Sequence, residues 1–270
     1  MTYGIIGVGA IAASIVSGLS EAVDDPPPIL LSPRNPQISA RLASRYPNVS
    51  ICSDNQAVVE GAPTVIISLR PQDALAVLRT LRFSAQQSII SVMAGISIEA
   101  LCPLVAPATA LARSIPLPAV ARREGLTPIL PPGGAAKALF DRLGGTIELE
   151  DVKVFDAMSA STATIASHFA YLGAISSWLV RHGVSSDEAA RYVATMFAGL
   201  TPALQSGKSF ECLAQDHATR GGTNELFLAH LTDTGLFGSV EQGLNQVLRR
   251  LADLGAWTDR AGHQSGESTG

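Results

Sequence analysis

Tyr3-Gly4-Ile5-Ile6-Gly7-Val8-Gly9-Ala10-Ile11-Ala12 is the stretch of sequence that decides the fold. Its first four residues predict a short buried strand, and the rest is a G-x-G-x-x-A turn that opens a helix. Gly7 permits the tight turn, Gly9 lets the backbone approach a pyrophosphate, and Ala12 lets the helix pack closely on the strand. Free backbone N–H groups at the start of that helix suit phosphate oxygens. We therefore predict a dinucleotide-binding turn formed by Gly7, Gly9, Ala10, Ile11 and Ala12.

The composition favours a globular protein with a small-molecule partner. Of its 270 residues, 47% are apolar, so the chain can bury a large core. The formal net charge of −4 leaves no basic stripe, which argues against nucleic acid as a partner. The cysteines at 52, 102 and 212 are isolated, with no histidine at metal-ligand spacing. We expect ordinary reduced thiols and no metal site.

The hydropathy pattern does not predict a membrane protein. No run of about eighteen apolar residues is free of polar interruption. The apolar N-terminus lacks the basic region and cleavage site of a signal peptide. We expect a cytoplasmic protein with no membrane contact.

The first 150 residues alternate short apolar runs with helical stretches, which is the pattern of a doubly wound parallel sheet. Strands are predicted at Tyr3–Ile6, Ile29–Leu31, Ser50–Cys52, Thr64–Ser68, Ser88–Val92, Ala108–Arg113, Leu126–Leu130 and Gly145–Glu148. Helices are predicted over 11–22, 36–46, 54–59, 71–81, 97–104 and 134–143. The sequence thus predicts a Rossmann-type α/β domain over 1–150.

After Asp151 the sequence becomes helical throughout, which predicts an all-α domain over 151–257. The helix expected over Ala157–Arg181 is apolar nearly all round, so it needs cover on every side. We therefore expect a subunit interface and a homodimer, and the sequence leaves higher assemblies open. The polar residues 258–270 predict a disordered tail. The further helices are expected at Ser186–Ser206, Phe210–Gln215, Thr223–Asp233 and Ser239–Leu254.

Residues after the second, fourth and fifth strands are expected to contact the cofactor. Ser32 and Arg34 occupy the place where an acidic residue would bind the ribose of NAD, and they suit a 2′-phosphate instead. The expected cofactor is therefore NADPH, with NADH as the alternative. The fourth strand leads into Leu69, Arg70 and Pro71 at the carboxyl edge of the sheet, where ligands collect. The small residues Ala94 and Gly95 would permit close approach of a nicotinamide ring.

Four motifs occur in the order Gly7–Ala12, Leu69-Arg70-Pro71-Gln72, Ile90–Ser97 and Ala112-Arg113-Ser114-Ile115-Pro116. They make the chain similar to the pyrroline-5-carboxylate reductase family. The family has a lysine-proline-glutamine at the second motif, a serine followed by alanine-glycine-isoleucine at the third, and an arginine before methionine-proline-asparagine at the fourth. The resemblance covers nearly the whole chain. It implies NAD(P)H-dependent reduction of a cyclic imine to an amino acid such as proline, at a site between the domains and close to a dimer interface.

The two substrate motifs of the family are altered in this chain. The helix that the family begins with glycines and a proline here reads Ser159–His168, which keeps hydroxyls such as Thr162. The family's serine-proline-glycine-glycine-threonine-threonine matches Thr219–Asn224. In that match Gly221, Gly222 and Thr223 would hold the substrate carboxylate at a helix start, and Asn224 replaces a hydroxyl that meets the imine nitrogen. Arg220 replaces the proline and adds a cation.

Asn224 and His168 are the candidate catalytic residues. A protonated imine is already electrophilic, so alignment and a hydride donor supply most of what its reduction needs. The leading prediction is an NADPH-dependent reductase of Δ1-pyrroline-5-carboxylate. One alternative is a reductase of another imine or of a 2-oxo or aldehyde acid, with His168 or Asn224 polarising the oxygen. A second alternative is a regulatory protein that binds NADP without hydride transfer.

Overall fold

The structure is a computed structural model that describes the backbone of residues 1–263 and the side chains of residues 1–254. It divides into two compact units. The first unit holds Met1–Ser159 together with the chain from Leu248 onward, and the helical unit holds Ala160–Val247. The predicted boundary after residue 150 lies slightly earlier than this division, because the start of the helical region packs with the first unit.

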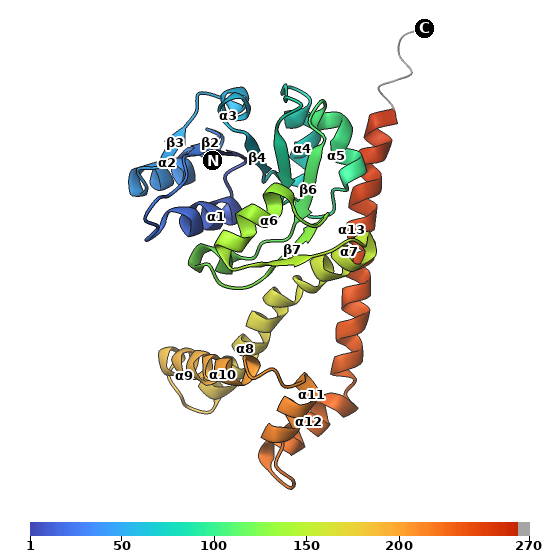
Figure 1. The fold of residues 1–270 in the computed structure, drawn as a ribbon. Helices are drawn as coiled ribbons and strands as arrows, with labels where there is room; N and C mark the ends of the chain where they lie inside the picture. Colours follow the sequence, from blue (N-terminus) through green and yellow to red (C-terminus); the bar gives the residue numbers. More distant parts are fainter. Residues whose placement is uncertain (264–270) are drawn as a thin grey trace. The chain divides into compact units, whose positions relative to one another are not determined.

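The first unit is built on an eight-stranded sheet in the order β3-β2-β1-β4-β5-β6-β7-β8 (Figure 1). All neighbours are parallel except β6 and β7, which are antiparallel. The order reverses beside β1, where Tyr3 pairs with Ile29 on one side and Thr64 on the other. The strands are β1 Tyr3–Ile6, β2 Ile29–Leu31, β3 Val49–Ile51, β4 Thr64–Ile67, β5 Ser88–Ser91, β6 Ala110–Ser114, β7 Thr127–Leu130 and β8 Thr146–Glu148.

Helices cover both faces of this sheet, which confirms the predicted doubly wound α/β class (Figure 1). One core lies beneath α1, α2 and α6 and takes the side chains of Ile5, Ile66 and Ile90. The other lies beneath α3, α4 and α5 and takes Ile6 and Ile67, since alternate residues of a strand face opposite sides. The helices are α1 Ala10–Ser20, α2 Pro36–Arg45, α3 Asn55–Gly61, α4 Pro71–Leu78, α5 Ile98–Val105 and α6 Gly134–Phe140, with 3₁₀ turns at Pro118–Arg122 and Asp141–Leu143.

Local signals explain where these helices begin. The side chains of Asn35, Asp54 and Ser97 accept a backbone N–H three residues ahead and so cap α2, α3 and α5. Proline stands at the first position of α2 and α4, where its missing N–H costs nothing. Helix α1 differs because Gly9 stands at its cap position and no side chain caps it. Its first N–H groups therefore remain available to another acceptor.

The helical region begins with two helices where one was predicted over Ala157–Arg181. Helix α7 covers Val152–Ser161 and packs with the first unit, and α8 covers Thr164–Arg181. A turn at 162–163 separates them. The predicted helix over Ser186–Ser206 is likewise divided, into α9 and α10. The remaining bounds are α9 Ser186–Ala198, α10 Thr201–Leu204, α11 Phe210–His217, α12 Thr223–Asp233 and α13 Leu236–His263.

Helix α13 extends well beyond its predicted end at Leu254. The tail predicted to be disordered over 258–270 therefore begins inside a helix, and the prediction is wrong for residues 258–263. Residues 264–270 lie outside the described part of the chain. The polar composition of the last residues had suggested an earlier end.

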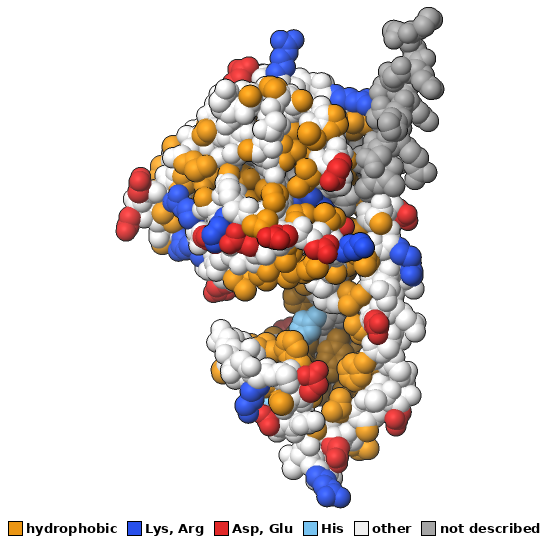
Figure 2. Space-filling view, turned by 45° about the vertical axis from the view of Figure 1, so that its right-hand side comes forward, with side chains coloured by type: hydrophobic (Ala, Val, Ile, Leu, Met, Phe, Trp, Pro, Cys, Tyr) orange, Lys and Arg blue, Asp and Glu red, His pale blue; other side chains and the backbone are white. Residues whose placement is uncertain are grey.

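The helical unit leaves most of its apolar side chains exposed. Among residues 160–247 only Ala160, Ala189 and Val193 are apolar and buried. Figure 2 shows hydrophobic side chains gathered on the surface of this unit, in the lower part of the view. An apolar surface of this extent requires cover from another molecule. The most exposed of these side chains, each more than 60% accessible, are Phe169, Tyr192, Leu204, Phe210 and Leu226.

Length and composition alone would allow one stretch, Val152–Arg181, to cross a membrane. The stretch comprises α7 and α8, so it is interrupted at the turn between them. It also contributes to both units, with α7 packed in the first unit. A single stretch of this kind is weak evidence for a membrane-spanning helix, because helices of protein interfaces have the same composition.

Candidate active site

The glycine turn after β1 has the form that a pyrophosphate needs. Gly7 adopts a φ of 88°, and a β-carbon there would lie 2.5 Å from the carbonyl oxygen of Ser68. A β-carbon on Gly9 would meet no atom within 4 Å, so its surroundings are open. With no side-chain cap on α1, the first N–H groups of the helix face this open space. The residues present therefore fit the phosphates of a dinucleotide, with Ala10 exposed, Ile11 partly accessible and Ala12 buried against the sheet.

Ser32 does not lie where a 2′-phosphate contact was predicted. The residue is 0% exposed, and its hydroxyl oxygen accepts the N–H of Gly7 at 3.0 Å. The prediction is wrong because the serine side chain turns inward at the end of β2. Its function in the structure is to fix the first glycine of the turn.

Asn35 is a residue of this site that the sequence analysis missed. Its amide nitrogen donates to the carbonyl of Val8 at 3.1 Å, and its amide oxygen accepts the N–H of Ile38 at 3.5 Å. One side chain thus joins the middle of the glycine turn to the start of α2. The signal was present, since an asparagine directly before Pro36 is a helix N-cap signature.

Two segments beside the glycine turn carry charged side chains, the loop after β2 and the start of α4. Arg34 follows β2 and has an exposed guanidinium, and its contact with a 2′-phosphate stays a prediction. Arg70 stands at the cap position of α4 and is also exposed. Asp73, in the first turn of α4, approaches Arg34 with 3.4 Å between Nη2 and Oδ2. Leu69 is buried and its side chain packs beneath Gly7, so it supports the turn from below. Pro71 opens α4.

The two residues predicted beside the nicotinamide ring differ in accessibility. Ala94 is exposed after β5 and remains available. Gly95 is buried with a φ of 75°, and a β-carbon there would lie 3.0 Å from Cβ of Leu254 and 3.3 Å from the carbonyl of Leu251. The prediction for Gly95 is therefore corrected: the residue lets the end of α13 approach the sheet.

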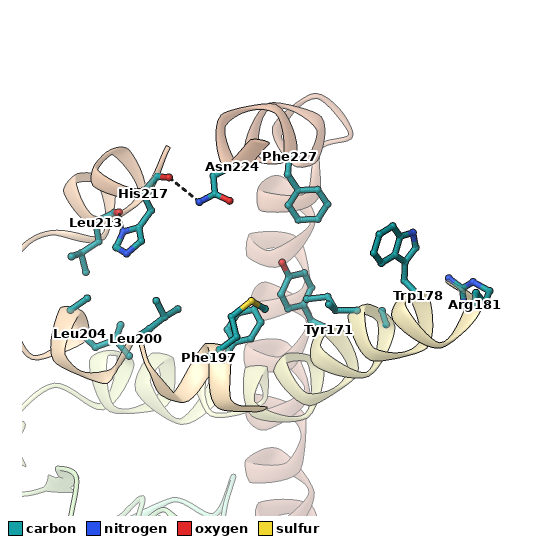
Figure 3. Close-up of a pocket in the computed structure, with 15 residues that line it drawn as sticks. Tyr171, Trp178, Arg181, Phe197, Leu200, Leu204, Leu213, His217, Asn224 and Phe227 are labelled. Atoms are coloured by element: carbon teal, nitrogen blue, oxygen red, sulfur yellow. Dashed lines mark hydrogen bonds between the residues drawn. The ribbon is translucent and has the colours of Figure 1, made fainter. Parts of the chain in front are cut away.

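A large apolar pocket of about 940 Å³ lies within the helical unit (Figure 3). Helices α8 and α9 supply the aromatic rings of Tyr171, Trp178 and Phe197, and α12 supplies Phe227. His217 and Asn224 are among the few polar side chains in its lining. His217 and Asn224 are both exposed and lie beside this apolar lining.

The amide orientation of Asn224 follows from its partner. Its Nδ2 lies 3.0 Å from the backbone carbonyl of His217 (Figure 3). Because a carbonyl oxygen can only accept, the amide nitrogen must be the atom that faces it. The amide oxygen therefore points away from His217 and remains an acceptor at the pocket.

The predicted carboxylate cradle is partly occupied by the chain itself. The N–H of Gly221 donates to Oε2 of Glu225 at 2.6 Å, and that of Gly222 donates to the carbonyl of Thr219 at 2.8 Å. The prediction that these two glycines donate to a substrate is therefore wrong for this conformation. Thr223 begins α12, where the first N–H groups still point outward.

The remaining candidates lie apart from Asn224. Thr162 stands in the turn between α7 and α8, and its carbonyl accepts the N–H of Ile165. His168 is exposed on α8, with its ring edge-on to Phe197 at 6.0 Å between centroids, and it is not part of the pocket lining. His217, by contrast, lines the pocket. Its Nδ1 lies 2.8 Å from the carbonyl of Leu213, which assigns the donor role to Nδ1.

A buried ion pair anchors α7 to the sheet. Arg113, at the end of β6, has a side chain only 5% exposed, and its Nη2 lies 2.9 Å from Oδ1 of Asp156. The ring of Phe155 lies 4.5 Å from the guanidinium carbon. Nε of Arg113 has no hydrogen-bond partner among the described residues. This contact explains why α7 packs with the first unit.

The cysteines show no sign of a metal or redox site within the described residues. No group of three or more histidine, cysteine, aspartate or glutamate side chains is positioned to hold a metal ion there. Cys52 is partly buried, and burial, with a smaller effect of the charge of Asp54, raises the pKa of its thiol. That thiol is therefore protonated at neutral pH.

Comparisons with known proteins agree with this geometry. Residues 2–95 match the family model described as NADP oxidoreductase coenzyme F420-dependent, and residues 151–254 match pyrroline-5-carboxylate reductase dimerisation. A pyrroline-5-carboxylate reductase of Mycobacterium leprae is 30% identical over 78% of this chain and 74% of its own. The chain belongs to the pyrroline-5-carboxylate reductase family. Its members are NAD(P)H-dependent oxidoreductases that act on the CH–NH group of an imine.

Two further pyrroline-5-carboxylate reductases cover almost the entire chain. Pyrroline-5-carboxylate reductase 2 of Bacillus subtilis is 26% identical over 93% of this chain and 94% of its own. The 1-pyrroline-5-carboxylate reductase structure from Streptococcus pyogenes is 25% identical, with a TM-score of 0.80 and coverage of 94% and 98%. The dimerisation match accounts for the exposed apolar surface, since homo-oligomerisation through the helical region would cover it.

Proposed function

We propose that this protein is an NADPH-dependent reductase of a small cyclic imine acid, with Δ1-pyrroline-5-carboxylate as substrate and L-proline as product. Family membership supports the reaction class, and the amide oxygen of Asn224 offers an acceptor for an imine N–H. The exposed guanidinium of Arg34 supports NADPH over NADH, because it can pair with a 2′-phosphate.

The hydrogen-bonding character of Asn224 is compatible with an imine substrate. One N–H of the Asn224 amide donates to the carbonyl of His217, which leaves the amide oxygen and the second N–H for a ligand. A protonated imine carries an N–H that donates to such an oxygen. The oxygen of a 2-oxo or aldehyde acid is itself an acceptor and would have to use the second N–H of the amide instead. The residue that replaces the family's hydroxyl therefore retains a role suited to the imine nitrogen.

Reduction of a protonated imine requires the protein mainly to bind and align the substrate and the cofactor. NADPH, when bound, supplies the hydride that adds to the imine carbon, and the electrons of the C=N bond pass to nitrogen, which keeps its proton. The glycine turn and the start of α1 would hold the pyrophosphate, with Ser32 and Asn35 fixing the turn from behind. Asn224 Oδ1 would hold the iminium N–H, and the apolar pocket wall would exclude water.

The assembly and location of the enzyme are part of the proposal. A second copy of the chain would cover the exposed apolar side chains of α8 to α12 and give a homodimer. Phe169, Phe210 and Leu226 are the side chains that such a partner would remove from water. We place the enzyme in the cytoplasm, where its free thiols stay reduced.

The first test is NADPH oxidation by the purified protein with Δ1-pyrroline-5-carboxylate, compared with a 2-oxo acid and with NADH. Asn224→Ala removes the acceptor and should lower kcat/KM by about 10- to 100-fold, the range for losing a hydrogen bond to a charged group. Asn224→Thr restores the family's hydroxyl and should retain most of the activity. His168→Gln should change the rate little.

Each alternative has its own result in this assay. Turnover of the 2-oxo acid alone, with a rate that falls as a histidine deprotonates and that His168→Gln abolishes, would favour the carbonyl reductase. Tight NADPH binding without turnover of any imine or carbonyl would favour the regulatory protein. Equal activity of Asn224→Ala and the unmodified protein would remove Asn224 from the site.

A further inference from the structure

The Arg34–Asp73 ion pair joins the two segments on either side of the glycine turn, where the dinucleotide is expected. Strand β1 lies between β2 and β4, so the glycine turn lies between the loop after β2 and the start of α4. Arg34 belongs to that loop and Asp73 to the first turn of α4. Their 3.4 Å contact therefore joins the loop after β2 to the start of α4.

The two partners of this pair have opposite preferences for a nucleotide. A guanidinium binds the doubly charged 2′-phosphate of NADPH well, because its planar donors match phosphate oxygens. A carboxylate repels that phosphate but accepts a hydrogen bond from the 2′-hydroxyl of NADH. A 2′-phosphate must therefore displace the carboxylate from Arg34, whereas a 2′-hydroxyl does not have to.

Nothing else among the described residues neutralises Asp73 in the structure. Arg70 lies three residues earlier on α4 and is exposed, but it forms no ion pair within 4 Å in the described part of the chain. The carboxylate of Asp73 thus has Arg34 as its ion-pair partner. The two segments beside the glycine turn carry two cations, Arg34 and Arg70, and one anion, Asp73. Removal of Asp73 would leave both cations for the phosphate.

We propose that Asp73 is a specificity-determining residue that competes with the 2′-phosphate for Arg34 and so moderates the preference for NADPH. The inference rests on the proposed function, since it assumes that the crevice binds the nicotinamide cofactor. It accounts for an acidic side chain beside an arginine that otherwise suits phosphate.

The size of the effect follows from the exposure of the pair. The side chains of Arg34 and Asp73 are 55% and 36% accessible, so solvent screens the interaction. Exposed pairs of this kind shift an equilibrium by up to about fivefold at low salt. Asp73→Asn should therefore tighten NADPH about two- to fivefold and change NADH less than about twofold. The change should shrink in higher salt.

The experiment measures the dissociation constants of NADPH and NADH by fluorescence for the full-length protein and its variants. Asp73→Asn is compared with Glu99→Gln, which removes one exposed negative charge from the first turn of another helix. Arg34→Gln combined with Asp73→Asn closes a double-mutant cycle. Circular dichroism checks that each variant is folded.

The expected result is a rise in the NADPH-to-NADH affinity ratio for Asp73→Asn that is absent in Glu99→Gln and in the Arg34→Gln background. An unchanged or lower ratio in Asp73→Asn, with NADPH still bound tightly by the unmodified protein, would overturn the inference and leave the proposed function intact. Failure of the unmodified protein to bind NADPH would overturn both.

Discussion

Replacing Ser32 by alanine distinguishes two possible roles of this residue. Ser32 either contacts the 2′-phosphate or supports the glycine turn through its hydrogen bond with Gly7. The hydroxyl of Ser32 is fully buried and accepts the N–H of Gly7 at 3.0 Å. Ser32→Ala removes this acceptor and leaves the N–H of Gly7 without a partner in partly buried surroundings. Such a loss costs about 1–3 kcal/mol.

The affinity change follows from that free energy. Because Gly7 begins the turn that would bind the pyrophosphate, we expect most of the cost to appear in cofactor binding. Each 1.4 kcal/mol is a factor of ten, so the affinity should fall about 5- to 150-fold. The pyrophosphate is common to both cofactors, so NADPH and NADH should weaken by the same factor.

The assay is the measurement of both dissociation constants by fluorescence titration. Ser20→Ala is the matched control, because Ser20 is a buried serine at the far end of α1 whose hydroxyl accepts from Asn48 at 3.0 Å. It should leave both constants within about twofold of the unmodified protein, since surface and distant changes act weakly on a remote site. A loss confined to NADPH in Ser32→Ala would refute the reasoning and restore the 2′-phosphate role.

Three further predictions concern cofactor choice, stability and assembly. Arg34→Asp should weaken NADPH far more than NADH in the same titration, and equal losses would contradict the 2′-phosphate role of Arg34. Asp156→Leu should lower the free energy of unfolding in urea by about 3 kcal/mol, because it leaves the Arg113 guanidinium buried without its partner. The double variant with Arg113→Met should recover most of that loss, and a double variant less stable than the single one would argue against the pair. Phe169→Glu places a charge on a side chain 66% exposed in one subunit, and sedimentation velocity should show monomers if a second copy covers it. An unchanged dimer would exclude Phe169 from the interface.

Local sequence signals predicted the sheet of the first unit well. All eight predicted strands form, with ends shifted by at most two residues, because parallel strands buried on both faces require continuous apolar runs. The glycine turn was also predicted by residue, since its chemistry depends on backbone conformations that few residues adopt. The resemblance of four short motifs to the pyrroline-5-carboxylate reductase family agreed with the family models that match residues 2–95 and 151–254.

Helix ends and side-chain directions were predicted less well. The break between α7 and α8 lies in a run of small residues with no strong stop signal, and the packing of α7 on Arg113 fixes it. Gly95 resembled a residue that admits a ligand, but the end of α13, more than 150 residues later, packs over it. Contacts between such distant residues leave no local trace in the sequence.

The sequence by itself determined the Rossmann-type sheet, the glycine turn and the helical character of the second half, because these depend on apolar periodicity and on glycine at fixed spacing. Only the tertiary structure decided which way polar side chains face. It turned Ser32 inward onto Gly7, paired Arg34 with Asp73 across the turn, and oriented Asn224 by the carbonyl of His217. Each outcome depends on where a partner atom from another segment lies, which composition and spacing do not encode.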